Sequence, residues 1–108
     1  MSASRPLSDS PTDPLNALRR RARVLDRLLD DAGRVSRWPK RRAERQMILD
    51  YLIEFVPDDE VLSERQVNDL LASRHSFHDS ALLRRQLIDQ GMLVRRTDGS
   101  AYWKPARD

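Results

Sequence analysis

The chain has 108 residues, which is enough for one domain, and it has no cysteine, so disulfides and thiolate chemistry are excluded. Its 20 basic and 17 acidic residues give a net charge of +3, a balance that by itself says little about a polyanionic partner. No apolar run is long enough to cross a bilayer, and the first residues lack the apolar stretch of a signal peptide. We therefore expect a cytoplasmic protein.

Residues 1–13 combine serine, proline and acidic side chains with few apolar ones, and we expect a disordered tail there. An accessory helix is predicted over residues 14–33. Asp13 can cap this helix, Pro14 suits its first turn, and Gly33 suits its end.

The accessory helix has an apolar stripe longer than a small domain needs for support. The stripe recurs at three- and four-residue steps and includes Leu18, Leu25 and Leu28. Two interpretations remain open: the helix folds back on its own domain, or it pairs with its copy. The length of the stripe favours a homodimer through these three leucines.

Three further helices are predicted after this one. The first begins near Pro39 and ends before Pro57. The second begins at Ser63, which forms a capping box with Gln66, and a short strand is expected at Val61–Leu62 just before it. The third helix is capped by Asp79 and stopped by Gly91.

A β-hairpin is predicted at once after Gly91, with strands over residues 93–97 and 100–104. Asp98-Gly99 is a strong two-residue turn signal, and its register places Arg95 opposite Tyr102 and Val94 opposite Trp103. The fold class is therefore mainly α. We expect a winged helix-turn-helix over residues 37–104, made of three helices and a C-terminal hairpin, behind the accessory helix.

A combined motif supports this interpretation by resemblance. It consists of Glu64, Val67 and Asn68, then Asp79, Leu83-Arg84-Arg85, Leu87, Asp89, Gly91 and Leu93, and finally Asp98-Gly99 and Tyr102, after the basic opening Arg37–Arg42. It resembles a bacterial family of uncharacterised domains with the pattern D-x-x-x-L-R-R-x-L-[VI]-D-x-G followed by D-G-x-x-Y. The resemblance implies a winged-helix domain, sometimes fused to transcriptional regulators. This chain departs from the family at Leu62, where tyrosine is usual, and at Gln66, where glutamate is usual.

The candidate ligand of such a fold is double-stranded DNA, with the last helix in the major groove and the hairpin near the backbone. The candidate contacts are Lys40, Arg41, Arg42 and Arg45 at the start of the helix that begins near Pro39, Arg85 and Gln86 on the helix capped by Asp79, and Arg95, Arg96 and Lys104 on the hairpin. This distribution favours contacts to the DNA backbone over base reading. Solvated arginines, or arginines paired with nearby carboxylates, are an equally weighted alternative.

Other chemistry has less support in the sequence. His75, His78 and Asp79 have a spacing that can suit a metal, but the chain has no further histidine or cysteine, and Asp79 serves as a cap. No glycine-rich phosphate loop or catalytic constellation is present, so neither an enzyme nor a cofactor is expected. Arg84 is expected to pair with Glu64 or Asp89. The preferred function is a small DNA-binding transcriptional regulator, and the alternative is a protein-interaction module that kept the fold without binding DNA.

Overall fold

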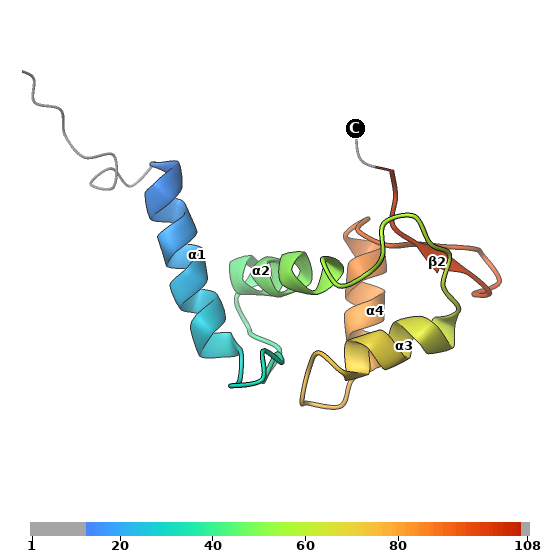
Figure 1. Cartoon of the computed structure of the whole chain (residues 1–108), viewed down its shortest axis with the longest axis horizontal. Coiled ribbons are helices and arrows are strands. Elements are labelled where there is room, and N and C mark those ends of the chain that lie inside the picture. The colour runs from blue at the N-terminus through green and yellow to red at the C-terminus, as the bar shows by residue number, and fades with distance from the viewer. Residues whose placement is uncertain (1–12, 107–108) are drawn as a thin grey trace, which may run out of the picture.

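In the computed structural model, residues 13–106 are described, and they form four helices and one two-stranded antiparallel hairpin (Figure 1). The elements are α1 (Pro14–Leu28), α2 (Arg42–Ile53), α3 (Glu64–Ala72), α4 (Ser80–Asp89), β1 (Val94–Arg95) and β2 (Tyr102–Trp103). The tail expected over residues 1–12 lies outside the described residues. The order of elements is consistent with a winged-helix-like layout.

Three helices begin at the side-chain caps that the sequence predicts. The Asp13 carboxylate accepts a hydrogen bond from the backbone N–H of Leu15 at 3.1 Å. Ser63 and Gln66 form a reciprocal capping box, with hydrogen bonds of 3.1 and 2.8 Å. The Asp79 carboxylate accepts from Leu82 N–H at 3.1 Å. Each cap satisfies donors that the first turn of a helix leaves without an internal partner.

The expected helix over residues 14–33 is too long, because α1 ends at Leu28. Leu29 is extended and pairs with Val35 in an antiparallel bridge, and Val35 in turn pairs with His75 in a parallel bridge. Gly33, with φ of +78°, lies in the turn between Leu29 and Val35 rather than at the helix end. The pairing with a distant segment thus replaces the last turn of the predicted helix.

The Asp30 carboxylate holds this turn. It accepts hydrogen bonds from the backbone N–H groups of Arg34 and Ala32, both at 2.9 Å, and from Arg34 Nε at 3.0 Å. These interactions, led by the Arg34 backbone N–H, lower the pKa of Asp30 from its ordinary value.

Acidification should therefore weaken the turn at Asp30. A carboxyl group with a lowered pKa in the folded state stabilises the fold fully above its unfolded pKa, about 4 for aspartate, and loses that contribution as the pH falls through its folded pKa. We expect Asp30→Asn to be less stable than the wild type at pH 6, with the difference shrinking towards pH 3. Urea unfolding at several pH values measures this, and Asp31→Asn, at the exposed neighbouring residue, is the matched control. A difference independent of pH would contradict the role of the charge.

Helix α2 begins at Arg42, later than the sequence predicts. Pro39 is buried in the preceding loop rather than placed in the first turn, and Arg41 is the N-cap, with no capping hydrogen bond from its side chain. The buried face of α2 consists of Ile48, Leu49, Leu52 and Ile53. The rings of Tyr51 on α2 and Phe55 just after it are only half-buried.

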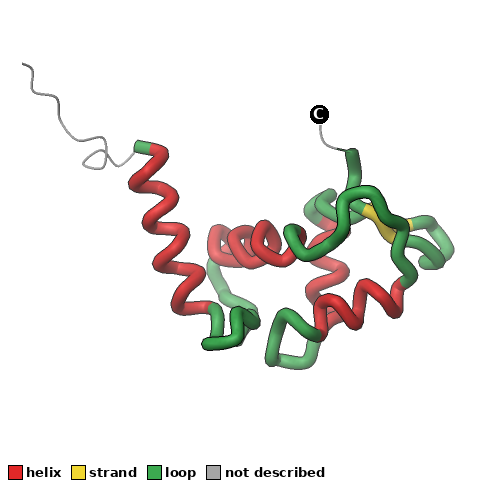
Figure 2. Tube along the Cα trace, in the orientation of Figure 1, coloured by secondary structure: helices red, strands yellow, loops and turns green. Residues whose placement is uncertain are grey.

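The core lies where α2, α3 and α4 meet, and the hairpin covers one end of it (Figure 2). Its fully buried residues come from every part of the described chain: Leu28, Val35, Ile48, Leu49, Leu52, Val67, Leu71, Leu83, Leu87, Leu93 and Tyr102. Leu28 therefore belongs to the core and is not available as a dimer seam residue. Leu25 packs against the same core but stays partly exposed, so the expected seam is corrected at Leu28.

The hairpin has the predicted register, with Val94 opposite Trp103 and Arg95 opposite Tyr102. The ladder is shorter than expected, and the turn is wider than two residues. Arg96 N–H donates to the Ala101 carbonyl, Gly99 N–H donates to the Arg96 carbonyl, and Gly99 has φ of +75°. Leu62 forms an isolated bridge with Tyr102, with both backbone hydrogen bonds at 2.8 Å, so the strand expected over Val61–Leu62 is reduced to one bridged residue. The hairpin is thus joined to the segment before α3.

Candidate nucleic-acid interface

Three candidate contacts gather at the start of α2. Lys40, Arg41 and Arg42 are all exposed. Arg41 is the N-cap of α2, and its side chain accepts no hydrogen bond from the first N–H groups of the helix. The positive end of the helix dipole and the three cations act with the same sign, so this end of α2 favours an anion.

Arg45 lies one turn further along α2 and is held by the protein. Its Nε donates to the Pro39 carbonyl at 2.6 Å, and its guanidinium lies 5.5 Å from the centroid of the Trp38 ring. These two contacts fix the loop that leads into α2. Arg45 is therefore better placed to position the cations before it than to move towards a ligand.

Helix α4 presents Arg85 and Gln86 between two hollows. The α2–α4 hollow is lined by Arg42, Arg45, Gln46, Leu49, Gln86 and Gln90. The α4–hairpin hollow is lined by Glu64, Arg84, Arg85, Ile88, Asp89, Arg95 and Tyr102. The structure thus brings Arg42 and Arg45 to one flank of α4 and Arg95 to the other.

Two side chains in the α2–α4 hollow were missed by sequence reasoning. Gln46 and Gln90 each follow a candidate residue, Arg42 and Gln86, by four positions on a helix. Such spacing places side chains on the same face of a helix, so it could have identified both glutamines from the sequence. Asp50 occupies part of the hydrogen-bonding capacity of Gln46, because Gln46 Nε2 donates to its carboxylate at 3.0 Å.

The two arginines of the hairpin lie on different faces. Arg95 lines the α4–hairpin hollow, whereas Arg96 lines a separate groove beside Trp103. Successive residues of a strand point to opposite faces, which accounts for the separation. Arg95 therefore lines the same hollow as Arg85, and Arg96 does not.

Lys104 is not available for a phosphate contact, contrary to expectation. Its side chain is buried, and Nζ donates to the carbonyls of Val56 at 2.9 Å and Ile53 at 3.2 Å. The same ammonium forms an ion pair with Asp58 at 2.8 Å. Lys104 thus joins the hairpin to the last residue of α2 and to the segment that follows it. The Lys104 ammonium is therefore paired within the protein.

Four motif residues form one network of polar contacts: Glu64, Asn68, Arg84 and Tyr102. The Arg84 guanidinium contacts the Asn68 amide oxygen and lies 4.0 Å from the Glu64 carboxylate, which confirms the pairing expected with Glu64. The Tyr102 hydroxyl donates to the same carboxylate at 3.1 Å. This network joins α3, α4 and β2, so these motif residues hold the three elements together beside the α4–hairpin hollow.

His75 has a structural role. His75 is buried, its Nδ1 lies 2.6 Å from the Leu71 carbonyl, and its Nε2 accepts from Asp79 N–H at 2.9 Å. Both ring nitrogens are therefore engaged. Among residues 13–106, no group of three or more metal-ligating side chains comes together.

The family comparison bears directly on the motif and its network. A family model described as an uncharacterized protein conserved in bacteria, DUF2087, matches residues 34–104, which is more than half of the chain.

The chain belongs to DUF2087.

The DUF2087 match includes α2, α3, α4 and the hairpin but leaves out α1. It contains the whole Arg84 network and both hollows beside α4. No curated protein and no solved structure matches this DUF2087 protein. None of its described helices is both long and apolar enough to span a bilayer.

Proposed function

We propose that this DUF2087 protein is a small cytoplasmic, DNA-binding transcriptional regulator with a winged helix-turn-helix fold. In this assignment α2, α3 and α4 are the three helices, Leu62 marks the short first strand, and the hairpin is the wing. Helix α4 would enter the major groove, as the second helix of a helix-turn-helix does. The order of elements and the pairing of Leu62 with Tyr102 support the assignment.

The observation that carries the proposal is the placement of cations on both flanks of α4. Arg42 lies across one hollow and Arg95 across the other, with Arg85 on the helix between them. A helix in the major groove lies between two phosphate backbones, so cations are needed on both sides of it. The exposed Lys40 and Arg41 extend the basic region at the start of α2.

Base reading in this proposal depends on two side chains. Arg85 can donate two hydrogen bonds to guanine, and Gln86 can pair with adenine. Asp89, exposed one turn after Arg85, repels phosphate and limits how closely that end of α4 approaches the duplex. We therefore expect most of the affinity to come from backbone contacts, with modest discrimination between sequences.

Asp89 also favours the second candidate function. An exposed carboxylate at the C-terminal end of α4 suits a protein surface with its own cations better than it suits DNA. In this alternative the domain keeps the fold and binds a protein partner through the same face. The two functions differ in whether the wild type binds duplex DNA at low salt.

Fluorescence anisotropy with mixed duplex DNA at salt concentrations from about 50 to 200 mM tests the proposal. Arg41→Ala combined with Arg42→Ala should weaken binding to all sequences and reduce the salt slope by about one unit per lost contact. Arg85→Ala should instead reduce discrimination between sequences by about 1–3 kcal/mol.

Arg27→Ala is the matched control, because it removes one exposed positive charge from α1, outside both hollows. It should leave the salt slope unchanged. A wild type that does not bind duplex DNA at the lowest salt overturns the proposal and leaves the interaction module.

A further inference from the structure

Large exposed apolar side chains gather at two places in the described structure. Leu15 and Leu18, in the first turns of α1, are 46% and 60% exposed, and Val61, in the loop before α3, is 69% exposed. Single exposed apolar residues are ordinary, but groups of them mark interaction surfaces. Each of these places has a second property that points to its partner.

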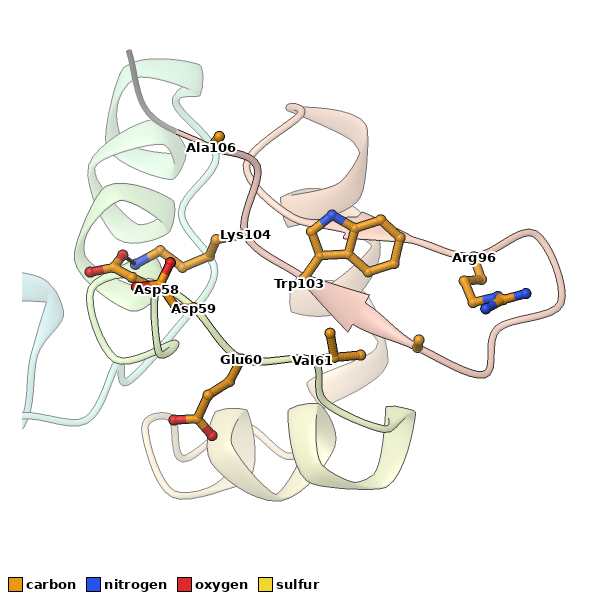
Figure 3. A pocket seen from close by; sticks show the side chains of 9 residues that line it. Asp58, Asp59, Glu60, Val61, Arg96, Trp103, Lys104 and Ala106 are labelled. Atoms are coloured by element: carbon orange, nitrogen blue, oxygen red, sulfur yellow. Dashed lines mark ion pairs between the residues drawn. The ribbon is translucent and has the colours of Figure 1, made fainter.

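Val61 lies in an apolar groove beside the hairpin. Figure 3 shows its side chain extending towards the Trp103 indole, with the small side chains of Ala101 and Ala106 also lining the groove. The loop at one end carries three consecutive carboxylates, Asp58–Glu60, and Arg96 lies at the other end. Since Lys104 is buried and paired with Asp58, the solvent-facing charge of this loop is negative.

The first turns of α1 have the opposite charge. Leu15, Leu18 and Ala22 follow one another at helical spacing on one face, and Arg19 and Arg23 lie beside them. Over its whole length α1 has five arginines and only one acidic residue, Asp26. It therefore presents an apolar strip bordered by positive charge.

The first turns of α1 cannot cover the groove of their own chain. The end of α1 is fixed to the domain by Leu28, which is 1% exposed, and by an ion pair between Arg21 and Asp50 at 3.2 Å. In Figure 1, α1 stands at one end of the molecule and the hairpin at the other. A helix that fills the groove must come from another chain.

We infer that the first turns of α1 from one copy bind in the apolar groove of a second copy. Leu15 and Leu18 would cover Val61 and Trp103, and Arg19 or Arg23 would face the carboxylates of the Asp58–Glu60 loop. An amphipathic helix in an apolar groove is a common recognition mode, and the charges of the two surfaces are complementary. This arrangement differs from the expected pairing of two α1 helices, which would bring two sets of arginines together and would need Leu28, which is buried in the core.

Sedimentation velocity on the full chain, up to about 200 µM, tests the inference, because so small a contact should give micromolar affinity. The wild type should self-associate. Leu18→Asp and Val61→Asp should each be monomeric alone, since each destroys one of the two surfaces. An equimolar mixture of the two variants should form a 1:1 heterodimer, because each variant retains the surface that the other lacks.

Charge reversal gives a second, independent arm. Asp59→Arg should weaken association, and combining it with Arg19→Glu should restore it, whereas Asp69→Arg, at an exposed acidic residue of α3, should have no effect. Circular dichroism checks that each variant is folded. A monomeric wild type overturns the inference, as does a Val61→Asp variant that still dimerises, which would indicate pairing of α1 helices. An equimolar mixture of Leu18→Asp and Val61→Asp that stays monomeric also overturns the inference.

Discussion

Replacing Leu87 by alanine is expected to lower the free energy of unfolding by about 2–5 kcal/mol, through lost burial and the cavity left behind. Leu87 has 0% exposure and lies in the core cluster with Leu83 and the buried residues of α2 and α3. Its carbonyl also accepts hydrogen bonds from Met92 and Leu93 N–H groups, which turn the chain from α4 into the hairpin. Urea denaturation of the purified chain measures the loss.

Leu82→Ala is the matched control for this substitution. It removes the same atoms from the same helix, but Leu82 is only half-buried on the outer side of α4. We expect Leu82→Ala to cost less than about 1.5 kcal/mol, because it removes less buried apolar surface than Leu87→Ala and leaves no closed cavity. Equal losses for the two variants would contradict the packing described for α4.

Lys104→Met should lower the free energy of unfolding by about 2–4 kcal/mol. The substitution keeps most of the apolar stem but leaves the Ile53 and Val56 carbonyls without their charged donor and Asp58 without its ion pair. Arg96→Met, at an exposed position on the same hairpin, should change stability by less than about 0.5 kcal/mol.

The same variant separates the structural role of Lys104 from a role in binding DNA. Where Lys104→Met remains folded, its salt slope in the anisotropy titration should equal that of the wild type, since a buried ammonium releases no counterion from DNA. A slope reduced by about one unit would show instead that Lys104 reaches phosphate.

Features set by neighbouring residues could be predicted from the sequence. The caps at Asp13, Ser63 and Asp79 require only one side chain and an N–H two or three positions later. The stop at Gly91, with φ of +72°, and the hairpin register also follow from local chemistry. These local signals together define the order of helices and hairpin.

Features that depend on distant segments could not be predicted. The end of α1 at Leu28 is decided by Val35, which bridges both Leu29 and His75. The burial of Lys104 depends on carbonyls 48 and 51 residues earlier in the chain. In the candidate interface, Arg42 and Gln86 share a hollow only because α2 and α4 lie against each other, and no local pattern records that contact.

The short segment from Tyr102 to Lys104 also constrains how this domain can form during synthesis. Tyr102 pairs with Leu62 and Glu64, and Lys104 ties down the end of α2, so the segment joins parts of the chain made much earlier. A nascent chain that has released only α2, α3 and α4 from the ribosome lacks these contacts and leaves part of its apolar core open to water. The second strand of the hairpin therefore completes the domain, and we expect cotranslational folding to wait until it emerges.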